Sequence, residues 1–203
     1  MTNLEWIIFP IAVFLEIIYL LLFMMTIKLP HFRFWPPPSA WSWQFILAWI
    51  MVGVVGLCGI WLGFIDLNSG FRFDFKIRLP LAGIFFVLGN AIGGWGNLAL
   101  GLRATLGLGN RLVIRGAYQY TRNPQYIGDS LIIIGFMVLT NSWMVWVIGI
   151  LALVLNALAP FTEEPWLEEH FGETYRAYKR RVPRFIGRRK VVAPQAEEDS
   201  RLC

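Results

Sequence analysis

Two polar segments interrupt an otherwise apolar chain, and together they could bind a zwitterionic ligand. The first, RGAYQYTRNPQYIGD at residues 115–129, holds arginines and tyrosines that can stack on or hydrogen-bond a flat heterocycle. A helix that begins just after the turn at Asn123-Pro124 would leave backbone amides free to bind an anionic group. The second segment begins with Glu163 and Glu164, whose carboxylates could bind a cation or hydroxyl groups.

The rest of the sequence indicates a membrane protein that would hold these segments at one surface. The chain has 203 residues, of which 57% are hydrophobic and 15% charged, whereas soluble domains have about one quarter charged residues. A helix of about 20 apolar residues crosses a bilayer, and such runs recur along the chain. We therefore predict an all-α, polytopic membrane protein with about five transmembrane helices, at residues 7–27, 43–65, 79–102, 126–139 and 142–158.

The last two apolar runs are predicted to form a helical hairpin. Only Thr140-Asn141-Ser142 separates them, and these residue types are typical of a turn. The hairpin would place the start of the fourth helix beside Glu163 and Glu164 at the end of the fifth. On its own, the segment at residues 115–129 could equally be a basic interfacial loop without a ligand.

A further helix is predicted after the fifth span. From Phe161 onward, apolar and aromatic residues recur at three- and four-residue steps, which indicates an amphipathic helix on the membrane surface, interrupted at Gly172. Residues 187–203 are mostly polar and aperiodic, and we expect a disordered tail there. Residues 1–186 would form one integral membrane domain.

The distribution of lysine and arginine predicts the orientation. Only Arg72, Lys76 and Arg78 fall on the side opposite the two polar segments. Because cytosolic loops carry the excess of basic residues, the polar segments and the C-terminus should be cytosolic and the N-terminus outside. The net charge of +5 then reflects topology and attraction to anionic headgroups. No nucleic-acid partner is expected, and the oligomeric state is not encoded in a readable form.

Glu16 and the two cysteines are the remaining candidates for chemistry. Glu16 lies near the middle of the first predicted helix, where an ionised carboxylate is costly. It either lines a cavity or is protonated and packed, and the sequence leaves both open. Cys58 and Cys203 provide neither a disulfide framework nor a metal-ligand set, so no metal site is expected.

The two polar segments also resemble a known family. GAYQYTRNPQYIG, followed by EEPWLEEHFGETYRAYKRRVPRF, is similar to the isoprenylcysteine carboxyl methyltransferase and phospholipid methyltransferase superfamily, over residues of about 109–186. The resemblance implies an integral membrane methyltransferase that uses S-adenosyl-L-methionine reached from the cytosol. It also implies a lipophilic or lipidated acceptor, reached from the bilayer lipids, of the isoprenylcysteine carboxylate or phospholipid amine type.

The resemblance also assigns roles by position. Arg181 would contact the acceptor or a carboxylate, and Tyr126 and Glu164 would join it as catalytic residues. The family's closing segment falls on Leu167, Tyr175, Tyr178, Arg181 and Pro183. The cofactor would be bound by Tyr118, Arg122, Asn123, Pro124, Tyr126, Gly128, Glu163 and Glu164.

Two departures from the family pattern keep alternatives open. Asn123 stands where many members have histidine, and an amide can hydrogen-bond a cofactor but cannot carry a proton. Asp129 directly follows Gly128, an ending similar to that of membrane sterol reductases, which use NADPH. The alternatives are therefore an NADPH-dependent reductase of a lipid double bond, which the short chain argues against, and a non-catalytic membrane scaffold.

Overall fold

A computed structural model describes residues 4–29, 31–109 and 111–187, and it is all-helical, as predicted. The predicted tail therefore lies almost wholly outside the described residues. Two short elements, α4 and the 3-10 helix η1, were not predicted from the sequence. The elements are α1 (Glu5–Lys28), α2 (Trp43–Ile65), α3 (Phe75–Leu100), α4 (Leu102–Thr105), η1 (Gly116–Gln119), α5 (Pro124–Thr140) and α6 (Trp143–Arg181).

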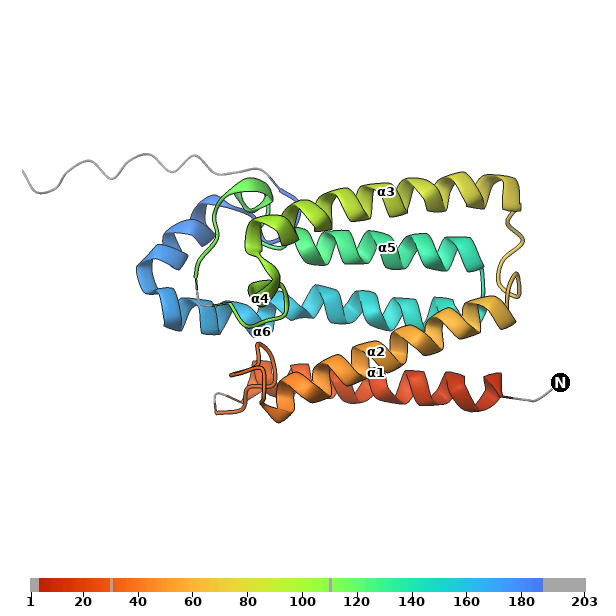
Figure 1. Cartoon of the computed structure of the whole chain (residues 1–203), viewed down its shortest axis with the longest axis horizontal. Helices are drawn as coiled ribbons and strands as arrows, with labels where there is room; N and C mark the ends of the chain where they lie inside the picture. Colours follow the sequence, from red (N-terminus) through yellow and green to blue (C-terminus); the bar gives the residue numbers. More distant parts are fainter. Residues whose placement is uncertain (1–3, 30, 110, 188–203) are drawn as a thin grey trace, which may run out of the picture.

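The five longer helices lie side by side along one axis (Figure 1). Helix α3 packs against α5, α5 against α6, and α6 against α1, which in turn contacts α2. Four of them, α1, α2, α3 and α6, are long and apolar enough to cross a membrane. The fifth, α5, has 17 residues, which corresponds to about 25 Å of helix. The outer surface carries many exposed large apolar side chains, among them Trp6, Phe14 and Leu57, as expected for contact with lipid.

The turn between α5 and α6 has the predicted hairpin chemistry. Asn141 adopts a left-handed conformation with φ of 46° and ends α5, and the Ser142 side chain caps α6 by accepting a hydrogen bond from the Val145 amide. This turn is fastened to the α2–α3 loop, because the Asn141 carbonyl accepts from the Gly70 amide at 2.7 Å and Ser142 donates to Asp66 at 2.5 Å. The hairpin thus has a fixed end opposite the two polar segments.

The prediction that the last membrane helix ends at residue 158 was wrong. Helix α6 continues through Pro160 and Pro165, and its one non-helical residue is Gly172, with φ of 54°, at the predicted interruption. The change from apolar to charged residues near Phe161 marks the membrane surface rather than the end of the helix. Since about 20 residues cross the hydrocarbon, the part of α6 after about Thr162 projects beyond it.

Close packing of α3 on α5 fixes where α5 begins. A Cβ atom on Gly128 would lie 2.5 Å from backbone atoms of Gly93, and a Cβ on Gly96 would lie 2.8 Å from Pro124. Only glycine permits this approach of two helices. The first turn of α5 is therefore held against α3, and its Tyr126 side chain reaches α6 by donating a hydrogen bond to Glu163.

Candidate functional site

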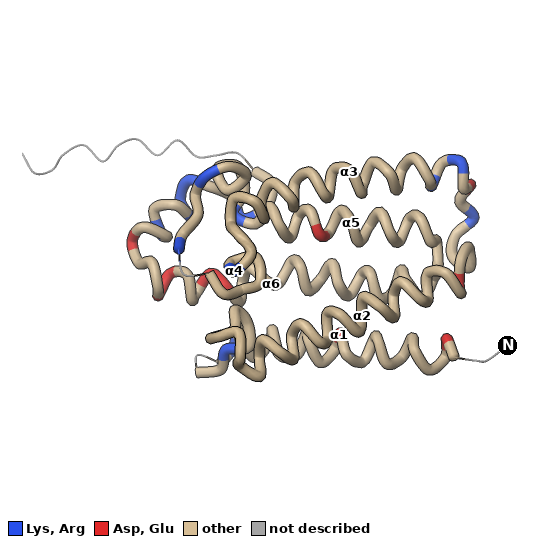
Figure 2. Tube along the Cα trace, in the orientation of Figure 1, with Lys and Arg blue, Asp and Glu red and all other residues tan. Residues whose placement is uncertain are grey.

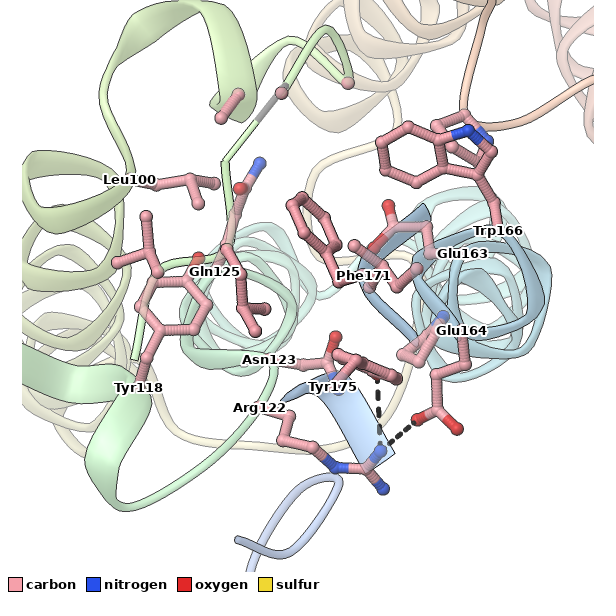
Figure 3. Close-up of a pocket in the computed structure, with 18 of the residues that line it drawn as sticks. Leu100, Tyr118, Arg122, Asn123, Gln125, Glu163, Glu164, Trp166, Phe171 and Tyr175 are labelled. Atoms are coloured by element: carbon pink, nitrogen blue, oxygen red, sulfur yellow. Dashed lines mark hydrogen bonds and ion pairs between the residues drawn. The ribbon is translucent and has the colours of Figure 1, made fainter. Parts of the chain in front are cut away.

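A polar cavity lies at the end of the bundle where α5 begins and α6 leaves the membrane (Figure 3). Its volume is about 870 Å³ when the space at its open mouth is included. Six of the predicted site residues line it, and Pro124, Gly128 and Arg181 do not. The six are Tyr118, Arg122, Asn123, Tyr126, Glu163 and Glu164.

Glu163 is the carboxylate that joins three distant parts of the chain. Its Oε1 accepts hydrogen bonds from the Trp35 Nε1 atom at 2.6 Å and from the Tyr126 hydroxyl. Burial at the cavity wall raises the pKa of Glu163, and the two hydrogen bonds oppose that rise. Trp35 was missed as a site residue because 128 positions separate it from Glu163 in the sequence.

Glu164, its neighbour, turns toward a cluster of cations. Arg184 donates from Nε at 2.7 Å and from a terminal nitrogen at 2.8 Å, Arg122 lies at 3.0 Å, and the Lys179 ammonium at 3.7 Å. Burial alone would raise the pKa of Glu164, but the hydrogen bonds from Arg184 and the charges of all three cations lower it. Glu164 is therefore ionised and neutralised from several sides.

Arg122 links this cluster to the cavity. The same terminal nitrogen that meets Glu164 also donates to the Tyr175 hydroxyl at 3.4 Å, as the dashed lines in Figure 3 show. Its backbone amide donates to the Pro183 carbonyl at 3.0 Å. Its Nε is buried without a hydrogen-bond partner among the described residues. That donor is available to a ligand, because buried polar groups in folded proteins are nearly always paired.

Asn123 acts through its amide, as its type allows. Its Nδ2 donates to the Arg184 carbonyl at 2.8 Å, and the Thr121 hydroxyl donates to the same oxygen at 3.1 Å. The side chain makes no cap hydrogen bond to α5. The first amides of α5 therefore keep their capacity to bind another acceptor beside Tyr126.

Aromatic residues after the kink at Gly172 complete the wall. Tyr175 and Tyr178 are both buried and line the cavity, and the Tyr178 hydroxyl donates to the Tyr118 carbonyl at 2.8 Å. Burial raises the pKa of the Tyr118 hydroxyl, which stays protonated at neutral pH. These contacts hold the part of α6 after Gly172 against η1, which precedes α5.

Arg181 lies outside the cavity, and Arg184, which was not predicted as a site residue, binds one of the two glutamates. Arg181 is exposed at the end of α6 and does not line the cavity. Arg184, three residues later, forms the bidentate pair with Glu164 and lies over the Phe161 ring at 3.8 Å from its centroid. The sequence indicates only that several arginines follow the two glutamates, and it does not distinguish Arg184 from Arg181. The assignment of Arg181 to the acceptor stays a prediction.

A second, apolar chamber lies deeper in the bundle, next to the polar cavity. Its volume is about 1290 Å³ by the same measure, and it is lined by side chains of α1, α2, α5 and α6 together with Phe86 of α3. Tyr19 lines this chamber and Tyr126 lines the polar cavity, and both pack on one hydrophobic cluster. Two compartments of different polarity thus adjoin near Glu163.

The fold is consistent with a multi-pass membrane protein that has a cavity lined by charged residues at one end and an apolar chamber inside. A family model described as phospholipid methyltransferase matches residues 77–174, which run from α3 through the two polar segments. Over these residues, just under half of the chain, the protein is similar to this family, part of the superfamily of membrane methyltransferases that act on phospholipids and isoprenylcysteines, and the match indicates an S-adenosylmethionine-dependent enzyme with a lipid-type acceptor. Comparison with curated proteins and with solved structures gave no match. The match favours the methyltransferase over the reductase and the scaffold.

Proposed function

We propose that the polar cavity binds S-adenosylmethionine and that the adjoining chamber admits the acceptor from the bilayer. The observation that carries this proposal is Glu163, a buried carboxylate that Trp35 and Tyr126 hold in the cavity wall. The cofactor has an ammonium, a sulfonium, hydroxyls and a carboxylate. Glu163 offers an acceptor to its cationic or hydroxyl groups, and the unpaired Nε of Arg122 offers a donor to its carboxylate.

Glu164 is then a positioning residue rather than a cofactor contact. Its carboxylate is already occupied by Arg184 and Arg122, and it holds the latter beside the cavity. The cofactor contacts proposed for this chain are Trp35, Tyr118, Arg122, Tyr126, Glu163 and Tyr175. Pro124 and Gly128 contribute by holding α5 against α3.

Methyl transfer requires alignment more than acid–base chemistry. Bound in the cavity, S-adenosylmethionine supplies a methyl group on a positively charged sulfur, which departs as a neutral thioether. The residues that line the cavity would hold the cofactor, which would give its methyl carbon to the acceptor's lone pair while the electron pair of the broken carbon–sulfur bond stays on sulfur. The chain's residues fix this in-line geometry and exclude water, which lowers the barrier by several kcal/mol.

The distribution of charge supports a cytosolic cavity. Most lysines and arginines gather at the cavity end of the bundle, and Arg72, Lys76 and Arg78 lie at the other end (Figure 2). Because the cytosolic face carries the excess of basic residues, we place the cavity and the C-terminus in the cytosol. The test is labelling with an impermeant thiol reagent, in sealed vesicles of known orientation, of Arg72→Cys and Arg103→Cys variants that carry no other cysteine. The cysteine at residue 72 should be labelled from the outer face and the cysteine at residue 103 from the cytosolic face. The opposite pattern would refute the proposed orientation.

Calorimetric binding of S-adenosylhomocysteine to the detergent-purified chain tests the cofactor site. Glu163→Gln keeps the shape but removes the charge, and it should weaken binding by about tenfold or more, as expected for a hydrogen bond to a charged group. Glu169→Gln makes the same change at an exposed position on the same helix and should bind like the wild type. Equal affinity of the two variants would refute the role of Glu163, and absence of binding by the wild type would refute the proposed cofactor site.

A further inference from the structure

The apolar chamber carries a small polar patch that holds carboxyl groups but no basic side chain among the described residues. Most of its lining is aliphatic or aromatic, contributed by α1, α2, α5 and α6. Its ionisable or strongly polar lining side chains are Glu16, Tyr19, Asp129 and Asn156, and no lysine, arginine or histidine of the described residues lines it. The chamber thus offers two carboxyl groups without a basic partner.

Glu16 is the group that most requires a ligand. Its side chain lines the chamber and the residue is only 3% exposed. One carboxyl oxygen, Oε2, is buried without a hydrogen-bond partner among the described residues. A buried carboxyl group left unpaired inside a membrane is costly and usually marks a functional site. The sequence left open whether Glu16 lines a cavity or is packed; it lines one.

Asp129 and Asn156 extend the patch with further acceptors. The Asn156 amide nitrogen donates to the Ser130 hydroxyl at 3.3 Å, which itself donates to the Tyr126 carbonyl at 2.7 Å. No described residue donates a hydrogen bond to the Asn156 side-chain carbonyl oxygen, which can therefore accept one from a ligand. Asp129, the departure that follows Gly128, lines the chamber as a second carboxyl group. All three polar groups therefore favour a ligand that donates hydrogen bonds.

The patch lies at the end of the chamber nearest the cofactor cavity. Asn156 precedes Glu163 by about two helical turns, or roughly 10 Å along α6, and Asp129 follows Tyr126 by less than one turn. The remainder of the chamber runs toward Val145 and Ile148 and is apolar. An amphiphile would therefore fit with its head near Glu16 and its hydrocarbon chain pointing away from the cavity.

We propose that the chamber selects a lipophilic amine that carries no phosphate or carboxylate, with Glu16, Asp129 and Asn156 binding its nitrogen. The proposal rests on the methyltransferase function and narrows the acceptor. An ammonium group finds two carboxyl groups here, whereas a phosphate or carboxylate head would find no basic side chain among the described lining residues. Before methylation the amine passes its proton to one of these carboxylates, which frees its lone pair for the methyl carbon.

Calorimetric titration of the purified full chain with probes of one chain length tests this selectivity. The probes are octylamine, octanol, octanoate and dioctanoyl phosphatidylethanolamine, each added to identical detergent micelles with and without protein. We expect the amine to bind most tightly. Glu16→Gln, which keeps the shape of the side chain, should weaken amine binding by about tenfold and leave octanol binding unchanged.

Two results would overturn the proposal. One is binding of octanoate or the phosphatidylethanolamine as tightly as octylamine, which the wild type alone can reveal even if the variant fails to fold. The other is a Glu16→Gln chain that melts normally and binds octylamine like the wild type. S-adenosylhomocysteine affinity, measured on the same samples, reports separately on the proposed function, since Glu16 does not line the cofactor cavity.

Discussion

Replacing Glu164 by glutamine should destabilise the fold through Arg122. The side chains of Glu164 and Arg122 are only 7% and 8% exposed, and their charged atoms are 3.0 Å apart. Glutamine keeps the shape of the side chain but leaves the buried guanidinium without a counter-charge. Breaking a buried pair in this way costs about 3 kcal/mol, which in a chain of this size lowers Tm by about 6 to 12 °C.

The assay is thermal unfolding of the purified chain, followed by tryptophan fluorescence. Glu173→Gln is the matched control, because Glu173 also binds two arginines, Arg176 at 2.9 Å and Arg180 at 2.6 Å, but in solvent. The double variant Arg122→Met, Glu164→Gln should recover part of the lost stability, since it removes the unpaired charge. A Glu164→Gln chain that melts at the same temperature as Glu173→Gln would refute the reasoning.

The same variant makes a prediction about pH. The folded pKa of Glu164 lies below its usual value of 4.5, because the hydrogen bonds and charges of its cations outweigh burial. Between the folded pKa and pH 4.5 the unfolded chain binds the extra proton, so the stabilisation is complete above pH 4.5 and is lost as the pH falls through the folded value. Tm of the wild type should therefore fall more steeply below pH 4.5 than that of Glu164→Gln, and parallel curves would contradict this.

Three further substitutions test single contacts. Trp35→Phe removes the donor to Glu163 but keeps an aromatic ring, and it should weaken S-adenosylhomocysteine binding by about fivefold in calorimetry; unchanged affinity would exclude Trp35 from the site. Arg184→Lys breaks a bidentate pair and should lower Tm, whereas Arg181→Lys at an exposed position should not; equal Tm values would contradict this. Gly128→Ala forces a Cβ to 2.5 Å from the α3 backbone and should lower stability by about 1–3 kcal/mol, while Gly53→Ala meets open space and should be neutral or better; urea titration compares the two.

Predictions from the sequence succeeded where one local pattern decides the structure. The bounds of α2 were predicted as observed, because an apolar run ends at the polar residue Asp66. The hairpin followed from Asn141, whose type tolerates the left-handed turn it adopts. Glu163, Tyr126 and Arg122 could be singled out because polar residues stand out sharply in an apolar chain.

The failed predictions have two physical causes. Some contacts form only in the tertiary structure, and a change in the polarity of the sequence does not by itself end a helix. Nothing local in the sequence indicates that Trp35 meets Glu163, or that Arg184 rather than Arg181 meets Glu164. A change of polarity near residue 160 predicted the end of a helix, yet a helix can pass from lipid into water without a break. Pro160 and Pro165 lie inside α6 without breaking it.

The unbroken course of α6 before the kink at Gly172 has a consequence for how the specificity of such an enzyme could change. Asn156 in the chamber and Glu163 in the cavity lie on the same continuous stretch of helix, which fixes the distance between them. In the function proposed above, this distance sets the position of the acceptor head relative to the methyl group. A single inserted residue between Asn156 and Glu163 would rotate one against the other by about 100°. Substitutions at the far end, around Val145 and Gly149, would instead shorten or lengthen the space for the acceptor's tail and leave the reacting end untouched. The preferred length of the acceptor's tail can therefore change without a change in the position of its reacting end.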